Sequence, residues 1–319
     1  MAFSAVMVLA LVSPVSMSLA RFTDSAADVS TITAAASFDV VAPSVQASAI
    51  SKVGPYLPGY IRPAGTYHIY ANVVDGGSAA SGVQAVTADV SAITAGAASV
   101  SLAGGSYTVG GVAYAYRSGT LTADSSAAGV RAYTVRATDV AGNASASTGF
   151  NVEVDDTRPT ASDVGTLNGA ATAGKPEAGD SIWFTFSEPM DPAGILSGWT
   201  GAGASVVVRI TDGGLLGDDV LTIRSAANSV DLPLGSVNLG APGYVSATED
   251  FGAAGTPSVM TISGNRITVL LGTPSGIAGS VLVAVNMTWT PSAGPFDRAG
   301  NACQTTMASE TDGLIDPEF

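Results

Sequence analysis

The sequence predicts an all-β protein made of two β-sandwich domains in tandem. Gly, Ala, Ser, Thr and Val dominate the 319-residue chain, and only 12% of its residues are charged, against about 25% in ordinary soluble domains. Short stretches of alternating apolar and polar residues recur between glycine-rich turns, which is typical of half-buried strands. An Asp-x-Ala-Gly-Asn turn follows two of these stretches, beginning at Asp139 and at Asp297.

The first predicted domain covers residues 40–155. Its clearest strand covers residues 66–74, where alternation places four side chains on one face: Tyr67, Ile69, Ala71 and Val73. His68, the single histidine, should point away from that face and be half exposed. Further alternating stretches bring the total to about seven or eight strands, the number expected of an immunoglobulin-like sandwich.

The second predicted domain covers residues 156–308. Asp155, Asp156 and Pro159 mark the boundary before it, because proline ends a strand ladder. The run Ser-Gly-Asn-Arg at residues 263–266 predicts a tight hairpin between two strands. Asp191 and Pro192 predict a short helical turn, with the aspartate as its cap and the proline at its first position. Residues 309–319 are predicted to be a polar tail.

The N-terminal residues predict export. Residues 1–20 are apolar around their centre, and Ser18 and Ala20 are the small residues that a signal peptidase reads. We expect a signal peptide there or, if it is not cleaved, a membrane anchor, although no Lys or Arg precedes the apolar run. Residues 21–39 are polar and predict a tether or a donor strand that adds to a sheet edge. A secreted or cell-surface location follows, with membrane contact only through an uncleaved N-terminus.

Two resemblances extend these predictions. The start of the predicted mature chain resembles the exported camelysin and biofilm-fibre family at Phe22, Asp24, Thr33, Ala34, Phe38 and Asp39. Residues 179–192, with the two Asp-x-Ala-Gly-Asn turns, resemble bacterial Ig-like modules of surface-layer and adhesin-type proteins. The second resemblance implies an immunoglobulin-like fold and a role as a stalk, spacer or adhesive unit.

Composition and missing motifs argue against several functions. A net charge of −14 with only two lysines does not suit a nucleic-acid partner. The single cysteine, Cys303, excludes an intrachain disulfide and a Cys-rich zinc site, and we expect it to be a small packed residue. Sequence signatures of nucleophilic catalysis and phosphate binding do not occur. Glu188 and Asp191 could hydrolyse a glycoside in principle, but the prolines between and after them favour a turn. We therefore predict that the protein is not an enzyme.

Acidic residues in turns are candidate calcium ligands. Asp139 and Asn143 share one turn, Asp155 and Asp156 lie at the domain boundary, and Asp75 lies in another turn. Calcium binds six to eight oxygen atoms, so a junction site built from these residues would stiffen a stalk. The alternative is that Asp139 bonds to its own backbone while the last two residues of its turn take positive φ. The loop at residues 212–219 is also acidic and is expected to be a solvated hairpin loop.

Aromatic residues separate two predicted functions. The leading one is an exported structural or adhesive protein whose partners are other surface proteins or copies of itself. The alternative is a carbohydrate-binding accessory module of a secreted system. Trp183 and Trp289 should fill the core, whereas Trp199 is a candidate ligand-binding residue. An open row formed by Trp199, Tyr114 and Tyr116 would favour glycans, and burial of these rings would favour a scaffold.

Overall fold

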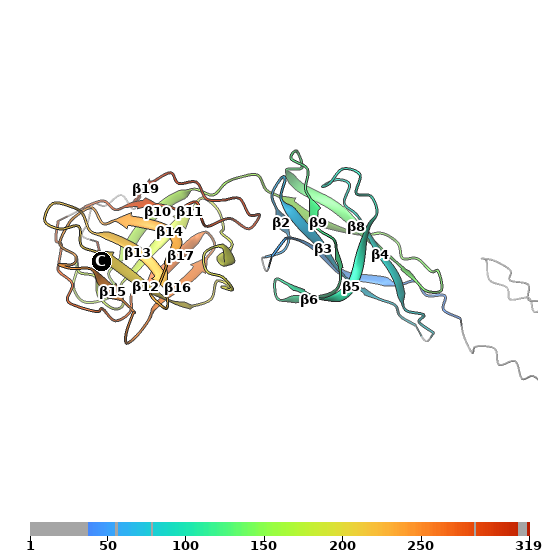
Figure 1. The fold of residues 1–319 in the computed structure, drawn as a ribbon, viewed down its shortest axis with the longest axis horizontal. Coiled ribbons are helices and arrows are strands. Elements are labelled where there is room, and N and C mark those ends of the chain that lie inside the picture. The colour runs from blue at the N-terminus through green and yellow to red at the C-terminus, as the bar shows by residue number, and fades with distance from the viewer. Residues whose placement is uncertain (1–37, 55–56, 78, 284, 312–317) are drawn as a thin grey trace, which may run out of the picture. The chain divides into compact units, whose positions relative to one another are not determined.

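The computed structural model describes residues 38–319 except 55–56, 78, 284 and 312–317. The signal peptide and nearly all of the tether predicted from the sequence therefore lie outside the described residues. Apart from one 3-10 turn, the secondary structure of the described part consists of β-strands, which confirms the all-β class. No helix within this part is long and apolar enough to cross a membrane. The strands form two sheets, seen as separate groups in Figure 1.

The first sheet forms the N-terminal β-region. Its strands are β1 (Ser44–Lys52), β2 (Tyr60–Ile61), β3 (Thr66–Val74), β4 (Val83–Asp89), β5 (Val100–Val109), β6 (Val112–Ser118), β7 (Leu121–Thr122), β8 (Gly129–Asp139) and β9 (Thr148–Val154). Their order is β1-β3-β6-β5-β4-β8-β9-β2, with β7 beside β3. The first and last strands of that order, β1 and β2, contact each other, and β1 also contacts β8 and β9. The sheet therefore curls round its own core.

The core of this region confirms the alternation predicted for β3. Tyr67, Ile69, Ala71 and Val73 are all buried in one cluster, together with residues from β1, β4, β8 and β9. The phenol of Tyr67 reaches the edge of this cluster, where its oxygen lies 2.7 Å from the hydroxyl of Thr94. A buried tyrosine thus keeps a polar partner for its hydroxyl.

The prediction for His68 is wrong, because its side chain is only 8% exposed. The other face of β3 is covered by a smaller apolar cluster that includes Tyr70 and Tyr114. The His68 ring packs edge-on against Tyr70 with 6.1 Å between centroids, and its Nδ1 lies 3.1 Å from the carbonyl oxygen of Ser118. Both faces of β3 are therefore buried, which alternation in a single strand does not show.

The second sheet forms the C-terminal β-region. Its strands are β10 (Ala161–Leu167), β11 (Ser181–Phe186), β12 (Ala204–Thr211), β13 (Val220–Ser225), β14 (Asp231–Asn238), β15 (Glu249–Phe251), β16 (Ser258–Ser263), β17 (Arg266–Leu270), β18 (Thr288–Thr290) and β19 (Ala308–Ser309). Their order is β10-β11-β17-β16-β12-β13-β14-β18-β19, with β15 beside β12. The outermost strands, β10 and β19, contact each other, so this sheet also curls round its core.

Two tryptophans occupy different faces of the second sheet. Trp289 is fully buried, and the rings of Phe184 and Phe186 pack edge-on against it at 5.1 and 4.9 Å between centroids. This confirms the core position predicted for Trp289. Trp183 alternates out of the core with its neighbours on β11, and its indole Nε1 donates a hydrogen bond to Asp163 at 3.0 Å. The predicted core position of Trp183 is therefore wrong.

Local turn predictions agree with the structure. The hairpin between β16 and β17 turns at Gly264 and Asn265, and Gly264 has a φ of 61°. The predicted helical turn is η1 (Pro192–Gly194), capped by the Asp191 carboxylate, which accepts a hydrogen bond from the Ala193 backbone N–H at 3.0 Å.

The last residue of the predicted polar tail packs against the C-terminal β-region. Phe319 is buried, and its ring lies edge-on against the ring of Tyr244.

Candidate metal centres

The two Asp-x-Ala-Gly-Asn turns have nearly the same hydrogen bonds. In the first turn, the backbone N–H of Asn143 donates to Asp139 Oδ1 at 2.7 Å, and the Asn143 side-chain amide donates to Asp139 Oδ2 at 2.9 Å. In the second turn, Asn301 makes both bonds to Asp297 at 2.8 Å. The backbone interaction predicted for Asp139 is confirmed. Positive φ is found at the glycine of each turn and not at the asparagine.

Each turn also fixes the chain that enters its own sheet. The side-chain amide of Asn143 donates to the carbonyl oxygen of Asp39 at 3.1 Å, shortly before β1 begins. The amide of Asn301 donates in the same way to the carbonyl oxygen of Asp155 at 2.9 Å, shortly before β10. One asparagine therefore positions an aspartate from the incoming segment beside the aspartate of the turn.

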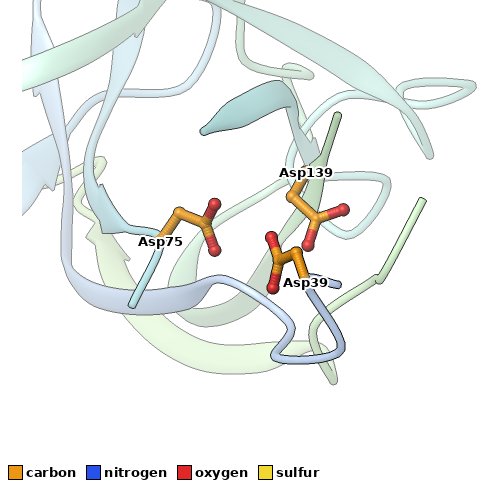
Figure 2. A group of neighbouring side chains, drawn as sticks. All are labelled: Asp39, Asp75 and Asp139. Carbon is orange, nitrogen blue, oxygen red and sulfur yellow. The ribbon is translucent and has the colours of Figure 1, made fainter. Parts of the chain in front are cut away.

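A third carboxylate completes each group. Asp75 follows β3 and Glu188 follows β11, so each comes from the end of a strand in the same sheet as the turn. Ligand atoms of Asp39, Asp75 and Asp139 all lie within 4.8 Å of one another, and the same holds for Asp155, Glu188 and Asp297. Figure 2 shows the carboxylates of the first group pointing toward one another. We call these two groups the N-terminal and C-terminal acidic clusters.

The calcium ligands predicted from the sequence do not all lie in one cluster. Asp139 and Asp155, which we expected at one junction, belong to separate clusters. Asn143 lies beside the N-terminal cluster as the residue that positions Asp39, and among the described residues Asp156 belongs to neither group. Sequence reasoning did not assign Asp39 or Glu188 to a metal site. The repeat of the turn was the available signal, because it implies an equivalent incoming acid in each half.

The two clusters have the same pattern of exposure, one buried and two half-buried carboxylates, but their pKa values shift in different directions. Burial, and then the charges of Asp297 and Asp155, raise the pKa of Glu188 to about 7. Burial also raises the pKa of Asp297. In the N-terminal cluster the pKa of Asp39 is lowered instead, chiefly by hydrogen bonds from Ser81 and Val41. Three close carboxylates repel one another, and a bound cation relieves that repulsion.

Each cluster has one buried oxygen that lacks a hydrogen-bond donor within the described part of the chain. These atoms are Asp75 Oδ1 and Glu188 Oε1. Buried carboxylate oxygens normally accept hydrogen bonds or bind metals. Three carboxylates supply up to six oxygens, the donor type that calcium prefers. Each arrangement can therefore hold a divalent cation, with backbone carbonyls or water completing the shell.

A lysine from the N-terminal β-region lies beside the C-terminal cluster. Lys52, at the end of β1, donates to the Asp191 carboxylate at 2.7 Å and to the carbonyl oxygen of Arg298 within the second turn. The Arg298 guanidinium lies over the Tyr60 ring, 5.5 Å from its centroid. Burial lowers the pKa of Lys52, an effect opposed by Asp191 and Asp297. The two β-regions therefore meet through a nearly buried ion pair.

The remaining candidate residues are packed. Trp199 is 8% exposed and belongs to the C-terminal core, which does not support the ligand-binding role considered for it. Tyr114 is 7% exposed and packs against Tyr70, with 5.7 Å between ring centroids, and Tyr116 is half-buried. Cys303 is buried, as expected for a small packed residue, and that burial raises its thiol pKa to about 11.

Comparisons with known proteins add no family assignment. A scan against protein-family models finds no match, and searches of curated proteins and of solved structures find no significant similarity. The resemblances to camelysin-like and Ig-like surface proteins therefore remain predictions from the sequence.

Proposed function

We propose that this chain is an exported structural or adhesive protein of the cell surface or extracellular matrix, built of two immunoglobulin-like sandwiches. Calcium bound at the two acidic clusters stiffens the segment that enters each sandwich. The observation that carries this proposal is the repeat of one arrangement, a turn aspartate, an incoming aspartate and an acid after a strand, in both β-regions.

The position of the clusters supports a mechanical role. Asp155 lies in the segment that joins the two sheets, between Val154 of β9 and Ala161 of β10. A cation shared by Asp155, Glu188 and Asp297 links that segment to the second sheet at two points. Lys52 adds a contact between the two β-regions at the same place. An extended protein that bears load or presents a binding surface needs this type of rigid junction.

Burial of the aromatic side chains favours the scaffold over the carbohydrate-binding alternative. A sugar platform needs exposed ring faces, as in other stacking sites. Trp199 and Tyr114 are both buried within apolar clusters. Neither ring therefore contributes to an open row on the surface.

Calcium titration of the chelator-treated protein tests the proposal. Extracellular calcium modules bind calcium with Kd values of about 0.1–1 mM. We expect isothermal titration calorimetry to give a Kd for calcium within that range. Calcium at about a hundred times Kd should stabilise the protein by about 2.7 kcal/mol for each site that binds only the folded state. Magnesium at equal ionic strength should have a smaller effect, because it requires near-octahedral geometry. If calcium produces neither heat nor a higher melting temperature, the calcium part of the proposal is wrong.

A further inference from the structure

The ion pair between the two β-regions brings an amine and a carboxyl group together where little water reaches them. Lys52 Nζ lies 2.7 Å from Asp191 Oδ2, and the two side chains are 10% and 1% exposed. Lys52 ends β1 and Asp191 caps η1, so the pair joins positions 139 residues apart in the chain. Removing two charges from water is costly, and only excellent geometry offsets that cost. An uncharged linkage between the same two side chains would remove it.

The Asp191 carboxyl group presents one oxygen to the amine and the other to a backbone donor. Oδ2 faces Lys52 Nζ, whereas Oδ1 accepts a hydrogen bond from the Ala193 backbone N–H at 3.0 Å. The backbone N–H of Asp191 donates in turn to the carbonyl oxygen of Phe296 at 3.0 Å, which fixes the base of the side chain. A donor held in this way stabilises the negative charge that develops on a carboxyl oxygen during nucleophilic attack.

The Lys52 amine is positioned by its surroundings as well. Its Nζ donates a second hydrogen bond to the carbonyl oxygen of Arg298 and lies 5.6 Å from the centroid of the Phe296 ring. Burial lowers the pKa of Lys52, the direction that favours the neutral amine, and Asp191 and Asp297 oppose this effect. Reacting groups held in contact and in a fixed orientation behave as if each were present at very high concentration.

A cavity beside the pair provides an exit for a water molecule. Its volume is about 190 Å³, and its lining includes Lys52 and Gly300. Arg62 and Thr66 also line it and are exposed, so the cavity opens to solvent. Gly300 has a φ of 97°, and a Cβ at this position would lie 3.3 Å from Lys52 Cδ. The glycine therefore leaves room for the stem of the lysine.

An amide formed from this pair would keep the hydrogen bonds that the pair already has. Its carbonyl oxygen would be Asp191 Oδ1, which accepts from Ala193, and its N–H would face the carbonyl oxygen of Arg298. A buried amide with both polar groups hydrogen-bonded costs far less than a buried charge. The surroundings therefore suit the product of condensation as well as the reactants.

We propose that Lys52 and Asp191 condense to an intramolecular isopeptide bond, which links the two β-regions covalently. Lys52 Nζ forms a bond to Asp191 Cγ, and the bond between Cγ and Oδ2 breaks. The ammonium group gives up two protons, and both leave with Oδ2 as water. The step therefore conserves charge and needs no oxidant or second substrate. It goes beyond the function proposed above, because the bond forms without calcium and outside the two acidic clusters.

Peptide mapping of the full-length protein by mass spectrometry tests this bond. The peptides that contain Lys52 and Asp191 should be recovered as one branched species, lighter than their sum by one water molecule. Lys52→Arg is the matched control, because a guanidinium keeps the positive charge but should not condense. Its two peptides should be recovered separately at full mass. Lys175 and Glu177 form an internal control in the same digest, and their partly exposed pair should remain unlinked.

Two further measurements separate the isopeptide bond from other losses of water. Asp-Gly sequences, such as those at Asp75 and Asp212, can also lose water by forming a succinimide. Hydroxylamine opens a succinimide but leaves an isopeptide bond intact, so the mass loss should survive this treatment. On a denaturing gel the wild type should migrate faster than Lys52→Arg, because a covalent loop between positions 139 residues apart keeps the unfolded chain more compact.

Separate Lys52 and Asp191 peptides from folded wild type kept at neutral pH would overturn the proposal. A branched peptide through Lys175, or a water loss that hydroxylamine reverses, would overturn it as well. Calcium binding is measured independently by calorimetry on the same preparation. A linked protein that binds no calcium would remove the calcium part of the proposed function and leave the isopeptide bond, and an unlinked protein that binds calcium would do the reverse.

Discussion

The two acidic clusters have the same hydrogen-bonded frame in different surroundings. In both, an asparagine holds the incoming aspartate beside the turn aspartate. The acids of the N-terminal cluster adjoin exposed valines in the sequence, and the pKa of Asp39 is lowered. The C-terminal cluster lies beside Lys52 and Arg298, and burial raises the pKa values of Glu188 and Asp297. The turn motif therefore sets the geometry, and the burial and hydrogen bonding of each carboxylate set the direction of its pKa shift.

Calcium should stabilise the two clusters to different extents. At the C-terminal cluster a cation competes with a proton on Glu188 near neutral pH, and it restores charge balance to a partly buried group. At the N-terminal cluster hydrogen bonds from Ser81 and Val41 already lower the pKa of Asp39, so less repulsion is relieved on binding. We expect calcium to stabilise the C-terminal cluster more than the N-terminal cluster at pH 8, and the two to become more alike in acid.

The largest expected loss of stability follows from replacing Lys52, which lies beside the C-terminal cluster. Lys52→Ala leaves the Asp191 carboxylate, 1% exposed, without its ion-pair partner. Removing one partner of a buried pair costs about 3–5 kcal/mol, measured as the free energy of unfolding in urea. Lys175→Ala is the matched control, because its pair with Glu177 is partly exposed and exposed ion pairs contribute little to stability. Equal losses in the two variants would show that the junction ion pair has no special role.

An intermediate effect is expected at the two asparagines. Asn301→Ala removes the amide that bonds Asp297 and the Asp155 carbonyl, in a nearly buried position. The loss of a buried hydrogen-bonding group costs about 1–3 kcal/mol. Asn143→Ala removes the equivalent bonds in a less buried position and should cost less, about 1 kcal/mol. A larger loss for Asn143→Ala in urea unfolding would reverse the proposed order of the two clusters.

The smallest effect is a pH dependence from Glu188. Burial raises its pKa in the folded protein to about 7, above the ordinary value of 4.5. The folded state therefore binds this proton more tightly than the unfolded chain does. The stabilising contribution is fully present below pH 4.5 and is lost as the pH rises through about 7. In chelator, the stability of wild type relative to Glu188→Gln should fall between pH 5 and pH 8.

Calcium provides the control for that titration. A bound cation favours the ionised carboxylate, so saturating calcium should reduce or reverse the fall in relative stability. An unchanged difference between wild type and Glu188→Gln across this pH range, in chelator, would contradict the raised pKa.

Local patterns predicted much of the fold. Alternation in residues 66–74 identified the core face of β3, and Ser-Gly-Asn-Arg identified the hairpin at Gly264. Asp191 and Pro192 identified the only 3-10 turn among the described residues. Each of these signals depends on neighbours within one element. His68 and Trp183 were misplaced because their surroundings come from other strands, which a period of two does not encode.

The sites were predicted only in part for the same reason. Asp139 and Asn143 are close in sequence and were grouped correctly. Asp139, from a turn, and Asp155, from the domain boundary, were assigned to one calcium site because both are acidic, yet they belong to different clusters. Glu188 reaches Asp297 only because β11 ends where the second turn begins, which the isolated bridge between Met190 and Asp297 shows.

Calcium stoichiometry by isothermal titration calorimetry tests the central claim most directly. The wild type at pH 8 should bind two calcium ions per chain. Asp75→Asn should retain only the C-terminal cluster and Glu188→Gln only the N-terminal cluster, so each should bind one ion, and the double variant should bind none. Two ions bound by the double variant, or none bound by the wild type, would contradict the account of the paired clusters.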